Sequence, residues 1–70
     1  MTIFETINLT IEQAISEKEF TEVHLSYVDY KDFDNEDVKE LESWKEVEDS
    51  STMYEKEKEG IKFTLDVISS

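Results

Sequence analysis

Apolar residues between positions 3 and 15 recur at intervals of three and four, which is the spacing of one face of a helix. The apolar stripe consists of Ile3, Phe4, Ile7, Ile11, Ala14 and Ile15. Glu5, Glu12 and Ser16 fall mostly on the other side, so the pattern predicts an amphipathic first helix. Its start is open, because Thr10 could instead be the N-cap of a shorter helix, with Gln13 completing a capping box.

The period changes to two after residue 20, which is the pattern of a half-buried strand. In the first strand, Val23, Leu25 and Tyr27 alternate with polar residues. The clearest strand covers residues 61–68, where the apolar positions are Ile61, Phe63, Leu65 and Val67. Residues 52–57 precede it, and the intervening 58–60 predict a three-residue hairpin turn with a bulge, in which Gly60 adopts the left-handed conformation.

Residues 29–35 form a polar connection to a second helix. Asp34 or Asn35 is suited to the N-cap, because a side-chain oxygen there accepts a hydrogen bond from the first turn. Val38, Leu41 and Trp44 recur every three residues, which predicts a short amphipathic helix of two or three turns. Alternatively, residues 44–48 already belong to a strand.

These elements predict a single α+β domain over residues 1–70, in the order α-β-α-β-β. We expect a three-stranded, mainly antiparallel sheet with the N-terminal helix packed on one face. A chain of 70 residues with 37% apolar composition can build one thin core. The predicted core is Ile3, Ile7, Ile11, Ile15, Val23, Leu25, Tyr27, Leu41, Phe63, Leu65 and Val67.

The charge of the chain is more informative about function than any motif. The chain has 19 carboxylates, seven lysines and no arginine, for a formal net charge of −12. Ten of the carboxylates and three of the lysines fall in residues 29–49, which therefore carry −7. The ten are Asp29, Asp32, Asp34, Glu36, Asp37, Glu40, Glu42, Glu46, Glu48 and Asp49. Concentrated like charge weakens a small fold, while its field speeds encounter with a cationic partner.

We therefore expect these ten residues to form a binding surface for a basic protein. The alternative is that the acidity only keeps the protein in solution. Nucleic acids and anionic membranes are not expected as direct partners, because both attract lysine and arginine and repel carboxylates.

Other classes of protein lack their characteristic residues here. Without cysteine there is no disulfide framework and no thiolate zinc site. No basic segment followed by an apolar run opens the sequence, and no apolar stretch approaches about 18 residues. We therefore expect a cytoplasmic protein, in which the sequon at residues 8–10 is a chance match.

Catalytic parts are also missing from the sequence. His24 is the only imidazole and lies in the middle of a predicted strand. Gly60 is the only glycine, whereas loops that bind phosphate groups need several. A catalytic pair of carboxylates needs a cleft that raises the pKa of one acid, and so small a domain has little room for one. We expect neither enzymatic activity nor a cofactor.

Residues 32–36 resemble the opening of a calcium-binding loop. If Asp32 is position one, Asp37 occupies position six, where the sharp turn requires glycine. Ser43 occupies position twelve, where the loop requires a bidentate glutamate. Because the match fails at both places, we expect no dedicated metal site.

Two pairs of glutamates, Glu36 with Glu40 and Glu42 with Glu46, would be neighbours on the second helix. Residues four apart on a helix have Cβ atoms about 5–6 Å apart, and rows of carboxylates at this separation approximate the phosphates of one nucleic acid strand. The nearby aromatic residues could supply the buried anchors of an interface, or could belong to the core. These aromatic residues are Tyr30, Phe33, Trp44 and Tyr54.

In size, acidity, absence of cysteine and mixed α/β character, the chain resembles the small inhibitors that bacteriophages make against host DNA-binding enzymes. These include anti-restriction proteins, anti-CRISPR proteins and uracil-DNA glycosylase inhibitors, several of which act as DNA mimics. The resemblance is one of composition over the whole chain and assigns no role to any single residue. It implies that the protein acts in the host cytoplasm on a restriction, CRISPR or DNA-repair enzyme.

The leading hypothesis is therefore an inhibitor, monomeric or homodimeric, that occupies the basic groove of a nucleic-acid-binding enzyme. The alternative is an antitoxin or immunity protein that neutralises a basic nuclease or other toxin. A third class is a subunit whose exposed strand edge, at residues 27–30 or 53–57, pairs with a partner chain.

Overall fold

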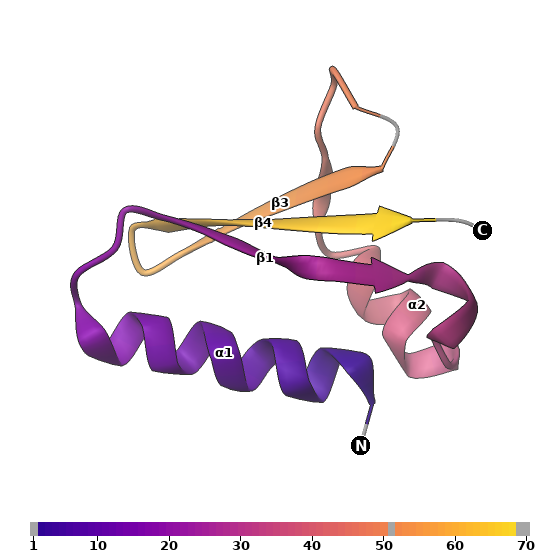
Figure 1. Cartoon of the computed structure of the whole chain (residues 1–70), viewed down its shortest axis with the longest axis horizontal. Helices are drawn as coiled ribbons and strands as arrows, with labels where there is room; N and C mark the ends of the chain where they lie inside the picture. Colours follow the sequence, from indigo (N-terminus) through magenta and orange to yellow (C-terminus); the bar gives the residue numbers. More distant parts are fainter. Residues whose placement is uncertain (1, 51, 69–70) are drawn as a thin grey trace.

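The structure is a computed structural model that describes residues 2–50 and 52–68. It is a small α+β domain with an N-terminal helix and a mixed sheet (Figure 1). The elements in chain order are α1 (Ile3–Glu17), β1 (Glu22–Asp29), the 3₁₀ turn η1 (Tyr30–Asp32), α2 (Asn35–Leu41), β2 (Lys45–Glu46), β3 (Met53–Lys58) and β4 (Ile61–Ile68).

The sheet contains four strands in the order β1-β4-β3-β2. The pairs β2–β3 and β3–β4 are antiparallel, whereas β1 and β4 run parallel. The prediction of three strands was therefore imprecise, because the short strand β2 extends the sheet beyond β3. The parallel pair arises because the chain crosses through η1, α2 and the β2–β3 hairpin before β4 returns beside β1.

The first helix begins at the start of the described chain. Thr2 is its N-cap, and the Thr2 Oγ1 accepts a hydrogen bond from the Glu5 N–H at 3.2 Å. The alternative start at Thr10 is wrong, since the Thr10 hydroxyl lies within the helix and donates to the Thr6 carbonyl oxygen at 3.3 Å. The helix ends at Lys18, which adopts a left-handed conformation with φ 56°.

The core lies between α1 and the face of the sheet that α1 covers. Its buried residues are Phe4, Ile7, Ile11, Ala14, Leu25, Leu41, Trp44, Ile61, Phe63, Leu65 and Val67. Of the residues predicted for the core, Ile3, Ile15 and Val23 lie only partly buried at its margin. The core instead includes Phe4 and Ala14, which lie nearer the centre of the same apolar stripe.

Tyr27 was predicted to be buried but is 67% exposed. The reason is a bulge in β1, where His24 pairs with Thr64 and Tyr27 pairs with Asp66. Over this interval β1 contains one more residue than β4, so the alternation of its side chains reverses. After the bulge Val28, rather than Tyr27, packs against the core.

The hairpin between β3 and β4 has a two-residue turn, because Lys58 pairs directly with Ile61. Glu59 and Gly60 both have positive φ angles, 53° and 77°, as a type I′ turn requires. The predicted three-residue turn was therefore wrong, although Gly60 does adopt the left-handed conformation. The pairing of Tyr54 with Leu65 then places Tyr54 on the core side of β3.

The second helix is shorter than predicted. Asp34 is its N-cap, as expected, but the helix ends at Leu41 and residues 45–46 form β2. Glu36 and Glu40 therefore share one helix, as predicted. The predicted helical pair of Glu42 with Glu46 was wrong, because Glu42 is the C-cap of α2 and Glu46 lies in a strand.

Candidate partner-binding surface

The ten carboxylates of residues 29–49 come from consecutive elements at one end of the molecule. Figure 1 shows that η1 and α2 lie at the end toward which β1 and β4 point. The chain then passes through β2 and a loop before it enters β3. In Figure 1 the loop before β3 projects at the top and α2 lies at the lower right, and both are away from the β3–β4 turn.

Seven of the ten side chains are exposed, and we call them the acidic surface. They are Asp32, Asp34, Glu36, Glu42, Glu46, Glu48 and Asp49. None of the seven forms an ion pair with another residue in the described part of the chain. Their charge therefore faces solvent and is available to a partner.

Asp29 and Glu40 are half-buried, and Asp29 has a structural task as well. One oxygen of Asp29 accepts a hydrogen bond from the Lys31 backbone N–H at 3.1 Å, which caps η1. The other oxygen lies 3.8 Å from the Lys31 Nζ. This contact neutralises part of the charge of Asp29, and we therefore do not count Asp29 in the acidic surface.

Asp37 does not belong to the acidic surface, because its side chain is only 1% exposed. Its Oδ1 accepts a hydrogen bond from the Phe4 N–H at 3.0 Å, and its Oδ2 accepts one from the Asp34 N–H at 3.2 Å. One carboxylate thus completes the capping box of α2 and satisfies a free N–H of the first turn of α1. Asp37 is removed from the predicted partner-binding set, since a partner cannot reach it in the folded protein.

The environment of Asp37 acts on its pKa in two directions. Burial raises the pKa, whereas hydrogen bonds from the Phe4, Asp34 and Ile3 backbone and from the Thr2 hydroxyl lower it. The hydrogen bonds prevail, so the pKa of Asp37 lies below the ordinary value of an aspartate. The positive ends of two helices meet at this carboxylate, which further favours its charged form.

A hollow of about 430 Å³ opens within the acidic segment, between α2 and the β2–β3 pair. Its lining combines aromatic, aliphatic and acidic side chains: Tyr30, Val38, Leu41, Glu42, Trp44, Glu46 and Tyr54. Glu46 and Tyr54 are directly opposite one another on β2 and β3. We call this cavity the aromatic hollow.

The wall of the aromatic hollow is connected to the core through ring contacts. The Tyr30 and Phe33 ring centroids lie 5.4 Å apart, and the Phe4 and Trp44 centroids lie 6.1 Å apart. Phe33 and Phe4 join the two pairs at 5.6 Å. Trp44 is only 5% exposed, and its Nε1 has no hydrogen-bond partner among the described residues.

The surroundings of Tyr54 in the aromatic hollow disfavour its charged form. Burial and the nearby charge of Glu46, together with Tyr30, raise the pKa of Tyr54 above the ordinary value of a tyrosine. Its hydroxyl therefore stays protonated at neutral pH. The part of this shift that comes from Glu46 also favours a nearby cation, whereas burial disfavours any charged group.

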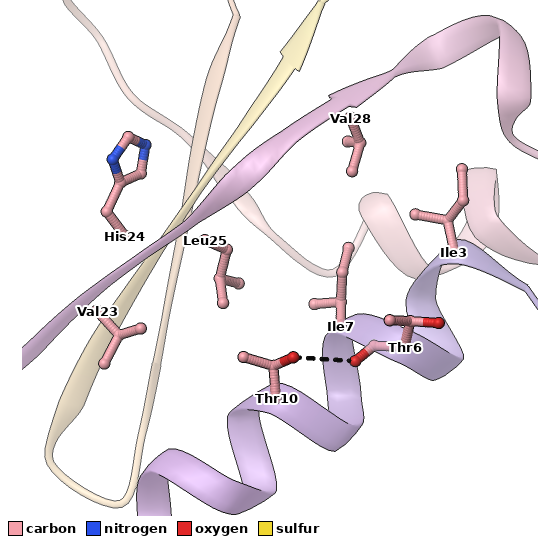
Figure 2. Close-up of a pocket in the computed structure, with 8 residues that line it drawn as sticks. All are labelled: Ile3, Thr6, Ile7, Thr10, Val23, His24, Leu25 and Val28. Atoms are coloured by element: carbon pink, nitrogen blue, oxygen red, sulfur yellow. Dashed lines mark hydrogen bonds between the residues drawn. The ribbon is translucent and has the colours of Figure 1, made fainter.

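A second cavity of about 360 Å³ lies between α1 and β1 (Figure 2). Val23, Leu25 and Val28 of β1 point toward α1, where Ile3 and Ile7 face them. The outer edge of β1 has no strand beside it in the described part of the chain. This apolar groove thus runs beside a free strand edge.

His24 is among the residues that line this groove, although its ring points away from α1 and the residue is exposed (Figure 2). Its ring centroid lies 6.3 Å from that of Tyr27. Within residues 2–50 and 52–68, no three histidine, cysteine or acidic side chains are grouped so that they could hold a metal ion. No helix in the same residues combines the length and apolar character needed to cross a membrane.

Sequence reasoning missed the structural task of Asp37 and the aromatic hollow. The first had a local signal, because Asp34 and Asp37 have the three-residue spacing of a capping box. The sequence indicated Tyr30, Trp44 and Tyr54 as possible interface anchors, but their position around one cavity depends on the pairing of β2 with β3. Comparison with known proteins found no matching family model, curated protein or solved structure.

Proposed function

We propose that this protein is a binding module that inhibits a nucleic-acid-binding enzyme by occupying its basic groove. The observation that carries the proposal is the acidic surface, whose seven exposed carboxylates form no ion pair within the described part of the chain. The basic groove of such an enzyme offers lysines and arginines that ordinarily contact phosphates.

Carboxylates can replace phosphates because they offer the same kind of contact. Each lysine or arginine that meets a carboxylate forms a charge-assisted hydrogen bond. Each such contact also releases counterions, as a phosphate contact does. The partner's affinity should therefore fall as the salt concentration rises, and DNA or RNA should compete for the same groove.

The experiment compares two triple variants that change the net charge equally. The first, Asp32→Lys, Glu36→Lys and Glu48→Lys, reverses three exposed charges of the acidic surface outside the aromatic hollow. The control, Glu12→Lys, Glu17→Lys and Glu19→Lys, reverses three exposed charges in and after α1.

Each variant is immobilised and exposed to a bacterial lysate, and the retained proteins are identified after washes at low and high salt. The wild type and the control should retain a nucleic-acid-binding protein that added DNA displaces, and the acidic-surface variant should not. Equal retention by all three proteins would contradict the proposal.

The same surface would also suit an antitoxin or immunity protein that neutralises a basic nuclease. Here the captured partner would be a single toxin, and its gene would lie next to the gene of this protein. Inspection of the neighbouring genes therefore separates this alternative from an inhibitor of a host enzyme.

A different observation favours the third class, a subunit that pairs through a strand edge. β1 is an edge strand, and the apolar groove of Figure 2 lies beside it. Main-chain hydrogen bonds to β1 would supply affinity, and side chains in the groove would supply specificity. Such binding would be nearly indifferent to salt, which distinguishes it from the acidic surface.

A further inference from the structure

The aromatic hollow differs from the rest of the acidic surface because it combines three kinds of group in one cavity. Tyr30, Trp44 and Tyr54 supply aromatic rings, Glu42 and Glu46 supply charge, and Val38 and Leu41 supply an aliphatic wall. Exposed carboxylates alone attract any cation. A cavity with this lining can distinguish one cation from another.

We propose that the aromatic hollow binds an arginine side chain of the basic partner, with the guanidinium group at Glu42 and Glu46 and against the aromatic wall. This inference rests on the proposed function and adds the anchoring residue that the partner supplies. It commits to arginine rather than lysine as the occupant.

The chemistry of the two basic side chains explains this choice. A guanidinium group is planar, stacks on aromatic rings and is more weakly hydrated than an ammonium group. It can also form two parallel hydrogen bonds to a carboxylate, whereas an ammonium group acts as a point charge. The aliphatic part of the arginine side chain can lie along apolar surface while its head meets the carboxylates.

The size of the cavity agrees with such an occupant. Its volume of about 430 Å³ falls within the range of about 300–1,000 Å³ that is common for ligand pockets. Aromatic residues and arginine are the most frequent energetic anchors of protein interfaces, and they act in pockets that exclude water. The hollow offers an open depression with aromatic side chains at the acidic end of the molecule.

The charge of one lining residue favours a cation in the hollow. The charge of Glu46, which after burial is the next cause of the raised pKa of Tyr54, attracts a cation into the hollow. Lys56 places its Nζ 5.8 Å from the centroid of the Trp44 ring, although Lys56 is not among the lining residues. This cation–π contact is internal to the chain, and it competes with a second cation for the Trp44 ring rather than supporting one.

The test uses two peptides, tetra-arginine and tetra-lysine, that have equal charge. Trp44 is the only tryptophan, so its fluorescence reports binding in the hollow at low salt. We expect tetra-arginine to bind the wild type about tenfold more tightly than tetra-lysine, because stacking and bidentate pairing add to the shared attraction.

Two double variants with equal loss of charge complete the design. Glu42→Gln with Glu46→Gln alters the hollow, whereas Glu36→Gln with Glu48→Gln alters the acidic surface outside it. All four side chains are exposed, so both variants should keep the fold, which circular dichroism verifies. The first variant should lose the preference for arginine, and the second should retain it.

The outcomes separate this inference from the proposed function. If both peptides bind the wild type equally well, or if both double variants lose the preference alike, the arginine site is wrong. The acidic surface could still bind a basic groove in that case. If neither peptide changes the Trp44 fluorescence of the wild type at low salt, the arginine site is also wrong, and the capture experiment above decides the proposed function separately.

Discussion

Two regions of this small protein differ in charge. They are the acidic segment of residues 29–49 and the β3–β4 hairpin. The hairpin, residues 53–68, has four acids and three lysines and thus a net charge of −1, whereas the acidic segment carries −7. In the hairpin Lys62 and Glu55 form an ion pair at 3.1 Å, which raises the pKa of Lys62. The exposed carboxylates of the acidic segment have no such partner among the described residues.

Burial shows the same division. Alternate residues of β4 are buried, and Phe63 and Leu65 at its centre are 0% exposed. In the acidic segment the buried side chains are those that attach it to the core: Asp37, Leu41 and Trp44. The hairpin therefore contributes mainly to the core, whereas the acidic segment is attached to the core by a few residues and leaves seven carboxylates exposed.

The largest expected effect comes from the centre of the hairpin. Phe63→Ala should lower the free energy of unfolding by about 3–5 kcal/mol, because it removes a fully buried ring and leaves a cavity. The exposed Glu48→Ala should change it by less than about 0.5 kcal/mol. Urea denaturation followed by Trp44 fluorescence measures both. Similar changes in the free energy of unfolding for the two variants would contradict the claim that the hairpin supplies the core and the acidic segment does not.

The second effect concerns Asp37, the buried acid of the segment. Asp37→Asn replaces one accepting oxygen with an amide group and leaves a buried backbone N–H without an acceptor. The free energy of unfolding should fall by about 1–3 kcal/mol. Glu36→Gln, an exposed change on the same helix, is the control and should have little effect.

The lowered pKa of Asp37 also predicts how the stability of the protein changes with pH. Because the pKa of Asp37 is lower in the folded protein, its stabilising contribution is present above the unfolded pKa of about 4. It is lost as the pH falls through the folded value. The stability of Asp37→Asn should therefore depend less on pH below about 4 than that of the wild type. Parallel acid unfolding curves for the two proteins would show that Asp37 has no such role.

The local alternation of β4 and the helical stripe of α1 could be predicted because each depends on residues near in sequence. The exposure of Tyr27 could not, since it follows from a bulge that only the pairing of β1 with β4 determines. Likewise, the charge of the acidic segment was evident from the sequence, but the burial of Asp37 required the contact with Phe4, 33 residues away.

A smaller effect should come from the turn of the hairpin. Glu59 adopts a left-handed conformation with φ 53°, which is costly for most residues and less so for asparagine. Glu59→Asn should therefore raise the free energy of unfolding by up to about 1 kcal/mol. Thermal unfolding checks this. A lower melting temperature than that of the wild type would contradict the type I′ turn.

The smallest effect should come from salt acting on the acidic segment. An increase in ionic strength from about 0.01 to 0.15 M shortens the screening length from about 30 to 8 Å. The wild type should gain about 0.5 kcal/mol, because a few like-charge contacts cost about 0.2–0.5 kcal/mol each. The Asp32→Lys, Glu36→Lys, Glu48→Lys variant should gain less. An equal gain in both proteins would place the repulsion elsewhere in the chain.

The most direct test of the central claim is the salt dependence of the Kd for the captured partner. We expect the Kd of the wild type and of the α1 control variant to rise about a hundredfold or more between 0.05 and 0.2 M salt. The acidic-surface variant should bind weakly at every concentration and lose this dependence. A Kd that is unaffected both by salt and by the reversal of these three charges would contradict the account.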